Sequence, residues 1–174
     1  MRRNFFIGIF PPKEVIENII HFKNSLSEFS VKWTKDEDIH FTLYRFHSVN
    51  NKRIEEILSC LNEISEEIEP FNILIENISY WPLIPERPKM IWANIKKSKS
   101  IDLIKRRINN SDSLDNNSYP HITLGRVSSL MFRNIEPEEI PVIDETINIS
   151  FRVSSLVLME EKLKYNKFIK EFKI

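Results

Sequence analysis

The sequence predicts an α+β fold in which most of the sheet is antiparallel. Two observations support this class. Segments with the apolar spacing of helices are interspersed with short, β-rich apolar segments, and two adjacent strand-like segments close the chain. The length of 174 residues, with 41% hydrophobic and 29% charged residues, is typical of a globular protein. We expect one domain over residues 1–174.

The first half of the chain predicts three strands and two helices. An apolar segment at 5–10 ends at two prolines, and Pro12 suits the first turn of a helix that runs to about Leu26. Further strands are expected at 30–33 and 39–46, with a polar connection at 34–38. The second helix, at 51–68, is the clearest element, because one apolar face recurs at helical spacing: Ile54, Ile57, Leu58, Leu61, Ile64 and Ile68.

The second half predicts one further helix among strands. A strand begins at Phe71, alternates through Ile73 and Ile75, and is extended by Ile78. Residues 80–88 contain three prolines and are expected to form a loop. A strand at 90–95 and a helix at 101–108 follow. The polar stretch 109–118 and the two prolines within 137–141 predict connections, 119–127 predicts a strand, and 147–159 with 165–174 predict a closing pair of strands.

Composition narrows the classes of function. The 25 basic and 25 acidic residues balance, whereas proteins that grip long nucleic acids usually carry a basic surplus, so an RNA partner would be met at a small site such as an end. Two glycines exclude a glycine-rich phosphate loop. One cysteine excludes an intrachain disulfide, and the four histidines show no zinc spacing. No segment approaches the roughly 20 apolar residues of a membrane span. We expect a cytoplasmic monomer without metal or cofactor.

The most informative feature is a repeated tetrapeptide. His40-Phe41-Thr42-Leu43 recurs as His121-Ile122-Thr123-Leu124, although the chain contains only four histidines and four threonines. Because side chains alternate on a strand, His40 and Thr42 share one face, as do His121 and Thr123. The intervening apolar residues anchor each strand in the core. If the two halves form pseudo-symmetric lobes, the two faces meet at a central cleft.

Two imidazoles and two hydroxyls at one point suit a phosphodiester. A neutral imidazole can take a proton from an attacking water, and a protonated one can give a proton to the leaving ribose oxygen. The hydroxyls of Thr42 and Thr123 can donate to the nonbridging phosphate oxygens. The sequence does not distinguish the proton donor from the acceptor.

Three other residues are candidates for substrate binding. Tyr44 shares the His40 face by alternation and Tyr119 shares the His121 face, so either ring could stack on a terminal base or pack in the core. Arg126 could contact phosphate. Strict alternation places it on the opposite face from His121, unless the strand bulges at Gly125.

These motifs resemble those of the two-histidine phosphoesterase superfamily, and within it the RNA 2′,3′-cyclic phosphodiesterases, once described as 2′-5′ RNA ligases. The similarity extends to the opening strand at 3–9, to Val31-Lys32-Trp33, to Arg87-Pro88-Lys89-Met90-Ile91-Trp92, to Tyr119 through Arg126 and to the last strand at 165–174. Lys32 and Trp81 depart from the arginine and phenylalanine that are usual in that family. A glycine usual before Tyr165 is also absent.

The resemblance implies a two-lobed fold around a central cleft, with the His-Thr pairs on facing strands. It implies hydrolysis of a 2′,3′-cyclic phosphate at an RNA 3′ end to a 2′-phosphate, with His40 as proton donor, His121 as acceptor and no cofactor. Alternatives remain open: action on 2′-5′ linkages or small cyclic nucleotides, ligation, or a module that binds RNA ends without catalysis.

Overall fold

The structure is a computed structural model that describes residues 2–25, 31–82, 88–109, 119–128, 143–162 and 165–174. The helices are α1 (Lys13–Ser25), α2 (Asn51–Glu67) and α3 (Lys99–Asn109), with a short 3₁₀ turn at Asp36–Asp38. The strands are β1 (Arg3–Ile9), β2 (Val31–Trp33), β3 (Phe41–Val49), β4 (Phe71–Trp81), β5 (Met90–Ile95), β6 (His121–Val127), β7 (Asp144–Val153), β8 (Ser155–Glu161) and β9 (Asn166–Lys173). This mixture of helices and antiparallel sheet confirms the predicted α+β class.

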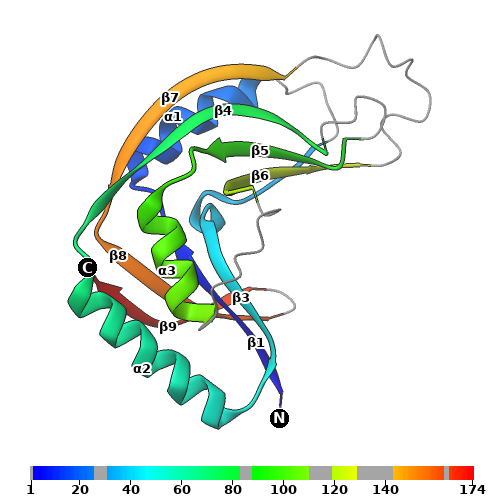
Figure 1. Ribbon diagram of the computed structural model, residues 1–174. Helices are drawn as coiled ribbons and strands as arrows, with labels where there is room; N and C mark the ends of the chain where they lie inside the picture. Colours follow the sequence, from blue (N-terminus) through cyan, green and yellow to red (C-terminus); the bar gives the residue numbers. More distant parts are fainter. Residues whose placement is uncertain (1, 26–30, 83–87, 110–118, 129–142, 163–164) are drawn as a thin grey trace.

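The strands form one strongly curled sheet (Figure 1). Its order is β7-β4-β5-β6-β3-β1-β8-β9, every pair is antiparallel, and β2 adds to β6. The order has a pseudo-twofold at its centre. β3 corresponds to β6, and β1 to β5, with α1 between β1 and β3 and α3 between β5 and β6. The two predicted histidine strands are therefore equivalent neighbours at the middle of the sheet.

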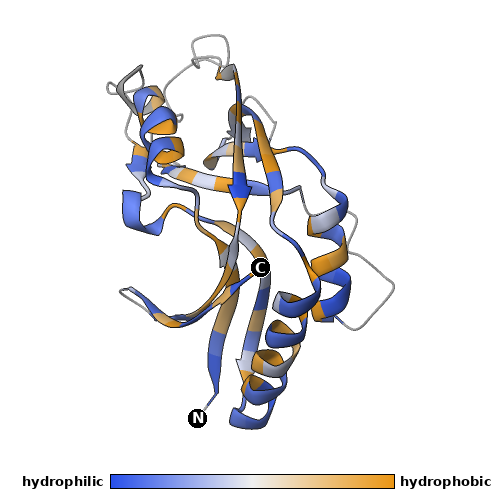
Figure 2. Cartoon of the chain, turned by 90° about the vertical axis from the view of Figure 1, so that its left-hand side faces the viewer, coloured by the Kyte–Doolittle hydropathy of each residue, from blue (hydrophilic) through white to orange (hydrophobic). Residues whose placement is uncertain are grey.

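The core lies on one face of this sheet. Buried residues of the central strands, such as Ile7, Phe41, Ala93 and Ile122, belong to one hydrophobic cluster. α2 and α3 pack against each other, and they contact β9 and β3, respectively. Each helix carries hydrophobic and hydrophilic residues together, as expected for helices that bury one side (Figure 2). The opposite face of the central strands is left for the polar residues of the motifs.

Local signals explain where the helices begin. The Asn50 side chain accepts a hydrogen bond of 2.9 Å from the Arg53 backbone N–H and caps α2, which begins at Asn51 as predicted. The Pro12 carbonyl accepts from Val15 and Ile16, so α1 begins directly after the proline, as the sequence indicates.

Two predictions of elements were wrong. Tyr80 and Trp81 lie in β4 rather than in a loop, because they pair with Ile91 and Met90, and the strand ends at the cis Trp81–Pro82 bond. Residues 147–159 form two strands, since Ser154 separates β7 from β8. β7 pairs with β4 at one end of the sheet, whereas β8 pairs with β1 and β9 at the other. The predicted connections 109–118 and 137–141 lie largely or wholly outside the described residues.

Candidate functional site

The structure brings the two repeated motifs side by side. His40 directly precedes β3, and His121 is the first residue of β6. The two strands pair through Phe41 and Ile122, which are both fully buried. Because directly paired residues share a face, the residues that flank them, the histidines and threonines, lie on the other face of the sheet.

His40 is held by the turn that precedes it and by two aromatic rings. The 3₁₀ turn at Asp36–Asp38 presents the Asp38 carbonyl to the imidazole, whose Nδ1 lies 2.6 Å from that oxygen. The ring stacks on Phe6, with centroids 4.7 Å apart, and lies 5.3 Å from Phe10. Gly8 lies beneath this group, since a Cβ there would be 3.5 Å from the His40 ring and 3.2 Å from Phe6. A Cβ at Gly8 would therefore crowd Phe6, the ring on which His40 stacks, more than it would crowd His40 itself.

His121 is held in the same way by different residues. Its Nδ1 lies 2.8 Å from the Tyr119 carbonyl, and Pro120 between them restricts Tyr119 to extended backbone. The imidazole stacks on Trp92 of β5, with centroids 3.5 Å apart and planes within 10°. Trp92 stacks in turn on Trp81 at 4.3 Å. Phe6 and Trp92 thus occupy corresponding strands of the pseudo-symmetric sheet.

The two backbone contacts fix the same tautomer in both rings. A carbonyl oxygen can only accept, so Nδ1 of each histidine carries the hydrogen. The Nε2 atoms have no hydrogen-bond partner among the residues that the structure describes. In a neutral ring Nε2 is then a proton acceptor, and in a charged ring it is a donor. This is the arrangement that acid and base catalysis requires.

The surroundings of the histidines favour the neutral forms. Burial is the main cause that lowers the pKa of His40, and the charge of Arg45 lowers it further, against the raising effect of the Asp38 carbonyl. Burial likewise lowers the pKa of His121, with contributions from Lys105, Arg45 and His40. Because the charge of Arg45 lowers the pKa of both histidines and His40 lowers that of His121, the two imidazoles lie in one electrostatic environment.

A β-bulge follows the threonine in each motif. On β3, Thr42 is opposite Gly8 and Tyr44 is opposite Ile7, which leaves Leu43 as the extra residue. On β6, Thr123 is opposite Trp92 and Gly125 is opposite Ile91, which leaves Leu124 as the extra residue. After a bulge the alternation of faces shifts by one position. The residue three positions after each threonine therefore returns to the histidine face.

This shift corrects two expectations from strict alternation. Arg126 is opposite Met90, on the face of β5 that carries Trp92, so it lies on the histidine face. Tyr44 leaves that face. It is opposite the core residue Ile7, and its hydroxyl donates to Asn109 Oδ1 of α3 at 2.9 Å. The structure therefore does not bring Tyr44 to the histidines.

Arg45 is a site residue that the sequence analysis missed. It is opposite Phe6, which stacks on His40, and its charge lowers the pKa of both histidines. A signal was present in the sequence: the repeat extends to six residues, His-x-Thr-Leu-x-Arg, ending at Arg45 and at Arg126. Tyr119 is 57% exposed beside the stack, with its ring 5.4 Å from Trp81. An aromatic surface therefore extends outward from His121.

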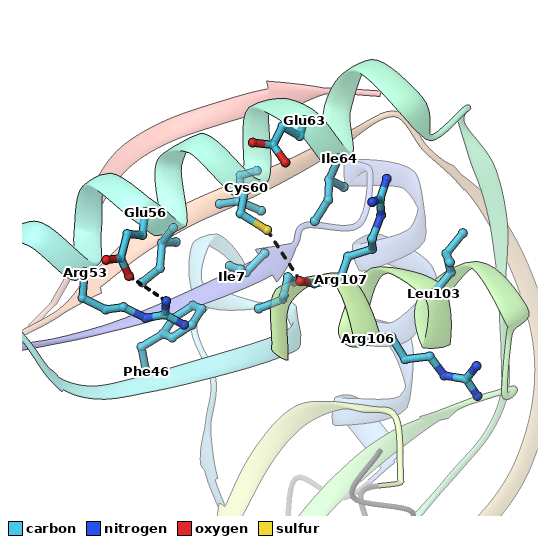
Figure 3. Close-up of a pocket in the computed structure, with 13 residues that line it drawn as sticks. Ile7, Phe46, Arg53, Glu56, Cys60, Glu63, Ile64, Leu103, Arg106 and Arg107 are labelled. Atoms are coloured by element: carbon cyan, nitrogen blue, oxygen red, sulfur yellow. Dashed lines mark hydrogen bonds and ion pairs between the residues drawn. The ribbon is translucent and has the colours of Figure 1, made fainter. Parts of the chain in front are cut away.

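A cavity of about 640 Å³ lies elsewhere, between α2 and α3 (Figure 3). Its lining includes Ile7 and Phe46 from the core face of the sheet, and Cys60, whose thiol lies 3.7 Å from the Arg107 carbonyl. It is therefore separate from the histidine face. Among the described residues, no group of three or more histidine, cysteine or acidic side chains could hold a metal ion. In the same part of the chain, no helix has the length and hydropathy needed to cross a membrane.

Comparisons with known proteins agree with this geometry. The model of the LigT-like phosphoesterase family matches residues 9–92, which include the first motif. The RNA 2′,3′-cyclic phosphodiesterase of Bacillus subtilis is 28% identical over 134 residues, 72% of each chain. That of Methanothermobacter thermautotrophicus is 22% identical over 170 residues, which cover 94% of this chain and 92% of the relative, so the similarity spans both motifs.

Solved structures show the same fold. TT0787 of Thermus thermophilus has a TM-score of 0.79 at 17% identity and covers 98% of this chain and 97% of its own. Escherichia coli LigT complexed with 3′-AMP has a TM-score of 0.75 at 17% identity, over 100% of this chain and 99% of that one. In its motifs, its fold and these matches, the chain is similar to the LigT-like phosphoesterases.

Proposed function

We propose that the protein opens the 2′,3′-cyclic phosphate at an RNA 3′ end and leaves a 2′-phosphate. The observation that carries the proposal is the shared tautomer of His40 and His121, whose unpartnered Nε2 atoms occur on one face of the sheet. A protein that only binds RNA ends does not require two proton-transfer groups. The names of the two relatives, both RNA 2′,3′-cyclic phosphodiesterases, support this substrate class.

In the proposed reaction one histidine acts as acid and the other as base. Nε2 of His121 takes a proton from water as the water oxygen attacks phosphorus. The bond from phosphorus to the ribose 3′ oxygen breaks, and Nε2–H of His40 protonates that oxygen. The ring-opened phosphate stays on the 2′ oxygen. A lowered pKa suits His121 as the base, because it favours the neutral imidazole. His40 must be protonated to act as the acid, and its lowered pKa opposes that form until a phosphate anion is bound beside it. Both proton transfers use side chains, so we expect activity without an added metal or cofactor.

The threonines and the outer residues have supporting roles in this proposal. Thr42 and Thr123, both half-buried on the histidine face, donate their hydroxyls to the nonbridging oxygens of the phosphate. Arg126, at the end of the β6 motif, contributes positive charge that attracts the phosphate. The exposed ring of Tyr119, next to Trp81, offers a surface on which the terminal base stacks. A site for one nucleotide end fits the balanced net charge of the chain, and LigT complexed with 3′-AMP is a precedent for a small nucleotide on this fold.

A panel of substrates in chelator tests the proposal. The parent protein is incubated with a short RNA that ends in a 2′,3′-cyclic phosphate, with a 2′-5′-linked dinucleotide and with a 2′,3′-cyclic mononucleotide, and the products are identified by phosphorus NMR. We expect the cyclic RNA end to become a 2′-phosphate. His40→Ala and His121→Ala should each lose about 10²- to 10⁴-fold in rate, whereas His47→Ala, at an exposed position of β3, should keep the parent rate.

The other outcomes separate the alternatives. If the cyclic RNA end is unchanged but another substrate of the panel is turned over, that substrate takes the place of the cyclic RNA end in the proposal. RNA-end binding without turnover of any substrate would favour a binding module. A 3′-phosphate product would contradict the assignment of the leaving oxygen.

A further inference from the structure

We propose that Arg45 binds phosphate in this site, as the β3 counterpart of Arg126; this inference rests on the proposed function. The two arginines end the two copies of the six-residue repeat. Each follows a bulge at the leucine of its motif, and the bulge brings each to the histidine face. The same bulge occurs on both central strands, so each half of the sheet places one arginine on the histidine face.

The position of Arg45 is set by its neighbours on the sheet. On β1 it is opposite Phe6, the ring on which His40 stacks. On β8, beyond β1, Glu161 holds it: the Arg45 Nε lies 3.3 Å from Glu161 Oε1. A guanidinium has five N–H donors, and one carboxylate takes two of them at most. Arg45 therefore retains donors for a second anion while Glu161 orients the side chain.

The charge of Arg45 reaches both reacting groups. It lowers the pKa of His40 and of His121. Lys105 adds to the effect on His121, whereas the charges of Asp38 and Glu161 raise the pKa of His40. A cation beside two imidazoles disfavours the positive forms that catalysis passes through. The placement becomes favourable when a phosphate anion is bound, because the anion offsets the repulsion and accepts hydrogen bonds from the guanidinium. The two arginines thus fit a substrate with a phosphate between the histidines.

The alternative is that Arg45 serves only its ion pair. Its side chain is 52% exposed, and an exposed ion pair of this kind adds little to stability. Arg53 provides a matched control for this alternative. It is also an arginine of similar exposure in an ion pair, with Nη1 2.8 Å from Glu56 Oε2, but it lies on α2 beside the separate cavity.

Titration with inorganic phosphate tests the inference without relying on turnover. The imidazole NMR signals of His40 and His121 report the Kd of the parent and of Arg45→Gln, Arg45→Lys and Arg53→Gln. We expect Arg45→Gln to weaken phosphate binding roughly 10- to 100-fold. Arg45→Lys should weaken it less, because it keeps the charge but loses the planar fork. Arg53→Gln should bind as the parent does.

Three results would overturn the inference. The first is phosphate binding by Arg45→Gln that equals that of Arg53→Gln. The second is a parent protein that does not bind phosphate at all. The third is Arg45→Lys with the full parent affinity, which would show that Arg45 acts only through its charge and not through direct hydrogen bonds to phosphate.

Steady-state kinetics on RNA that ends in a cyclic phosphate distinguish a failure of this inference from a failure of the proposed function. Arg45→Gln should lower kcat/KM and should move both limbs of its pH profile to higher pH, since the charge acts on both histidines. A role confined to the ion pair would leave the profile in place. If the parent leaves the cyclic phosphate unopened, the proposed function fails, while the phosphate titration still decides the role of Arg45.

Discussion

The two halves of the site use one backbone arrangement and surround it with different side chains. Around β3, the Asp38 carbonyl fixes His40, Phe6 stacks on its ring, and Arg45 follows the bulge. Around β6, the Tyr119 carbonyl and Trp92 take the corresponding places for His121. The repeated backbone gives both rings the same tautomer. The neighbours of the two rings differ, and such differences can give equivalent positions the distinct proton affinities that an acid and a base require.

The largest effect on activity among these tests of the symmetry between the halves is expected from the loss of either threonine hydroxyl. Thr42→Val and Thr123→Val preserve side-chain shape but remove a donor to the phosphate. Because a hydrogen bond to a charged group contributes about 1.5–3 kcal/mol, each variant should lose about 10- to 100-fold in kcat/KM. Thr146→Val, at an exposed position of β7, serves as the control. Parent rates for both motif variants, with parent stability, would show that the threonines are only structural.

Lys105 offers a way to distinguish the histidines by pH. Its charge lowers the pKa of His121 and is not among the principal causes for His40. Lys105→Gln should therefore raise the pKa of His121 selectively. If His121 is the base, which must be neutral to react, the acidic limb of the kcat/KM profile moves to higher pH while the basic limb stays in place. Movement of the basic limb alone would exchange the assigned roles of the two histidines.

A smaller effect is expected from the aromatic partner of His121. An indole face stabilises a nearby cation by about 0.5–1 kcal/mol at exposed sites, and Trp92 lies flat against the imidazole. Trp92→Leu should lower the pKa of His121, measured by NMR titration, and leave that of His40 unchanged. Phe6→Leu should act on His40 in the same direction but more weakly, since Phe has the weaker π-face. Equal changes at both histidines in either variant would contradict the separation of the two neighbourhoods.

Stability should depend on pH because of the same histidines. The pKa of each is lowered in the folded protein, so the unfolded chain binds protons more readily below the ordinary value of 6.5. The free energy of unfolding should therefore fall as the pH decreases through 6.5 toward the folded values. Denaturant titrations at a series of pH values should show a smaller decrease over this range in His40→Ala than in the parent. An equal decrease would assign the acid sensitivity to other groups.

Much of the framework could be predicted from the sequence, because it depends on local patterns. The apolar stripe located α2, and the strand predicted at 90–95 has the same bounds as β5. The division at Ser154 was missed, although the buried positions change parity there, from Phe151 and Val153 to Leu156 and Leu158. Such a change is visible only when the partner strands are known.

The site was predictable to the extent that it repeats. Paired His-x-Thr motifs indicated the central residues before any contacts were known. The bulges at Leu43 and Leu124 were not predicted, because a leucine fits regular alternation equally well and the extra residue is defined by the opposite strand. This omission misplaced Tyr44, made Arg126 uncertain and hid Arg45. The aromatic partners Phe6 and Trp92 come from other strands, and only the sheet order brings them to the histidines.

The central claim is that His40 and His121 act in one chemical step, and a double-mutant cycle tests it most directly. Single-turnover rates on cyclic-ended RNA, in chelator, are compared for the parent, His40→Ala, His121→Ala and the double variant. We predict that the double variant is hardly slower than the slower single variant, because residues that act as a unit lose their effect together. Losses that multiply, or a single variant with the parent rate, would contradict a joint acid–base step.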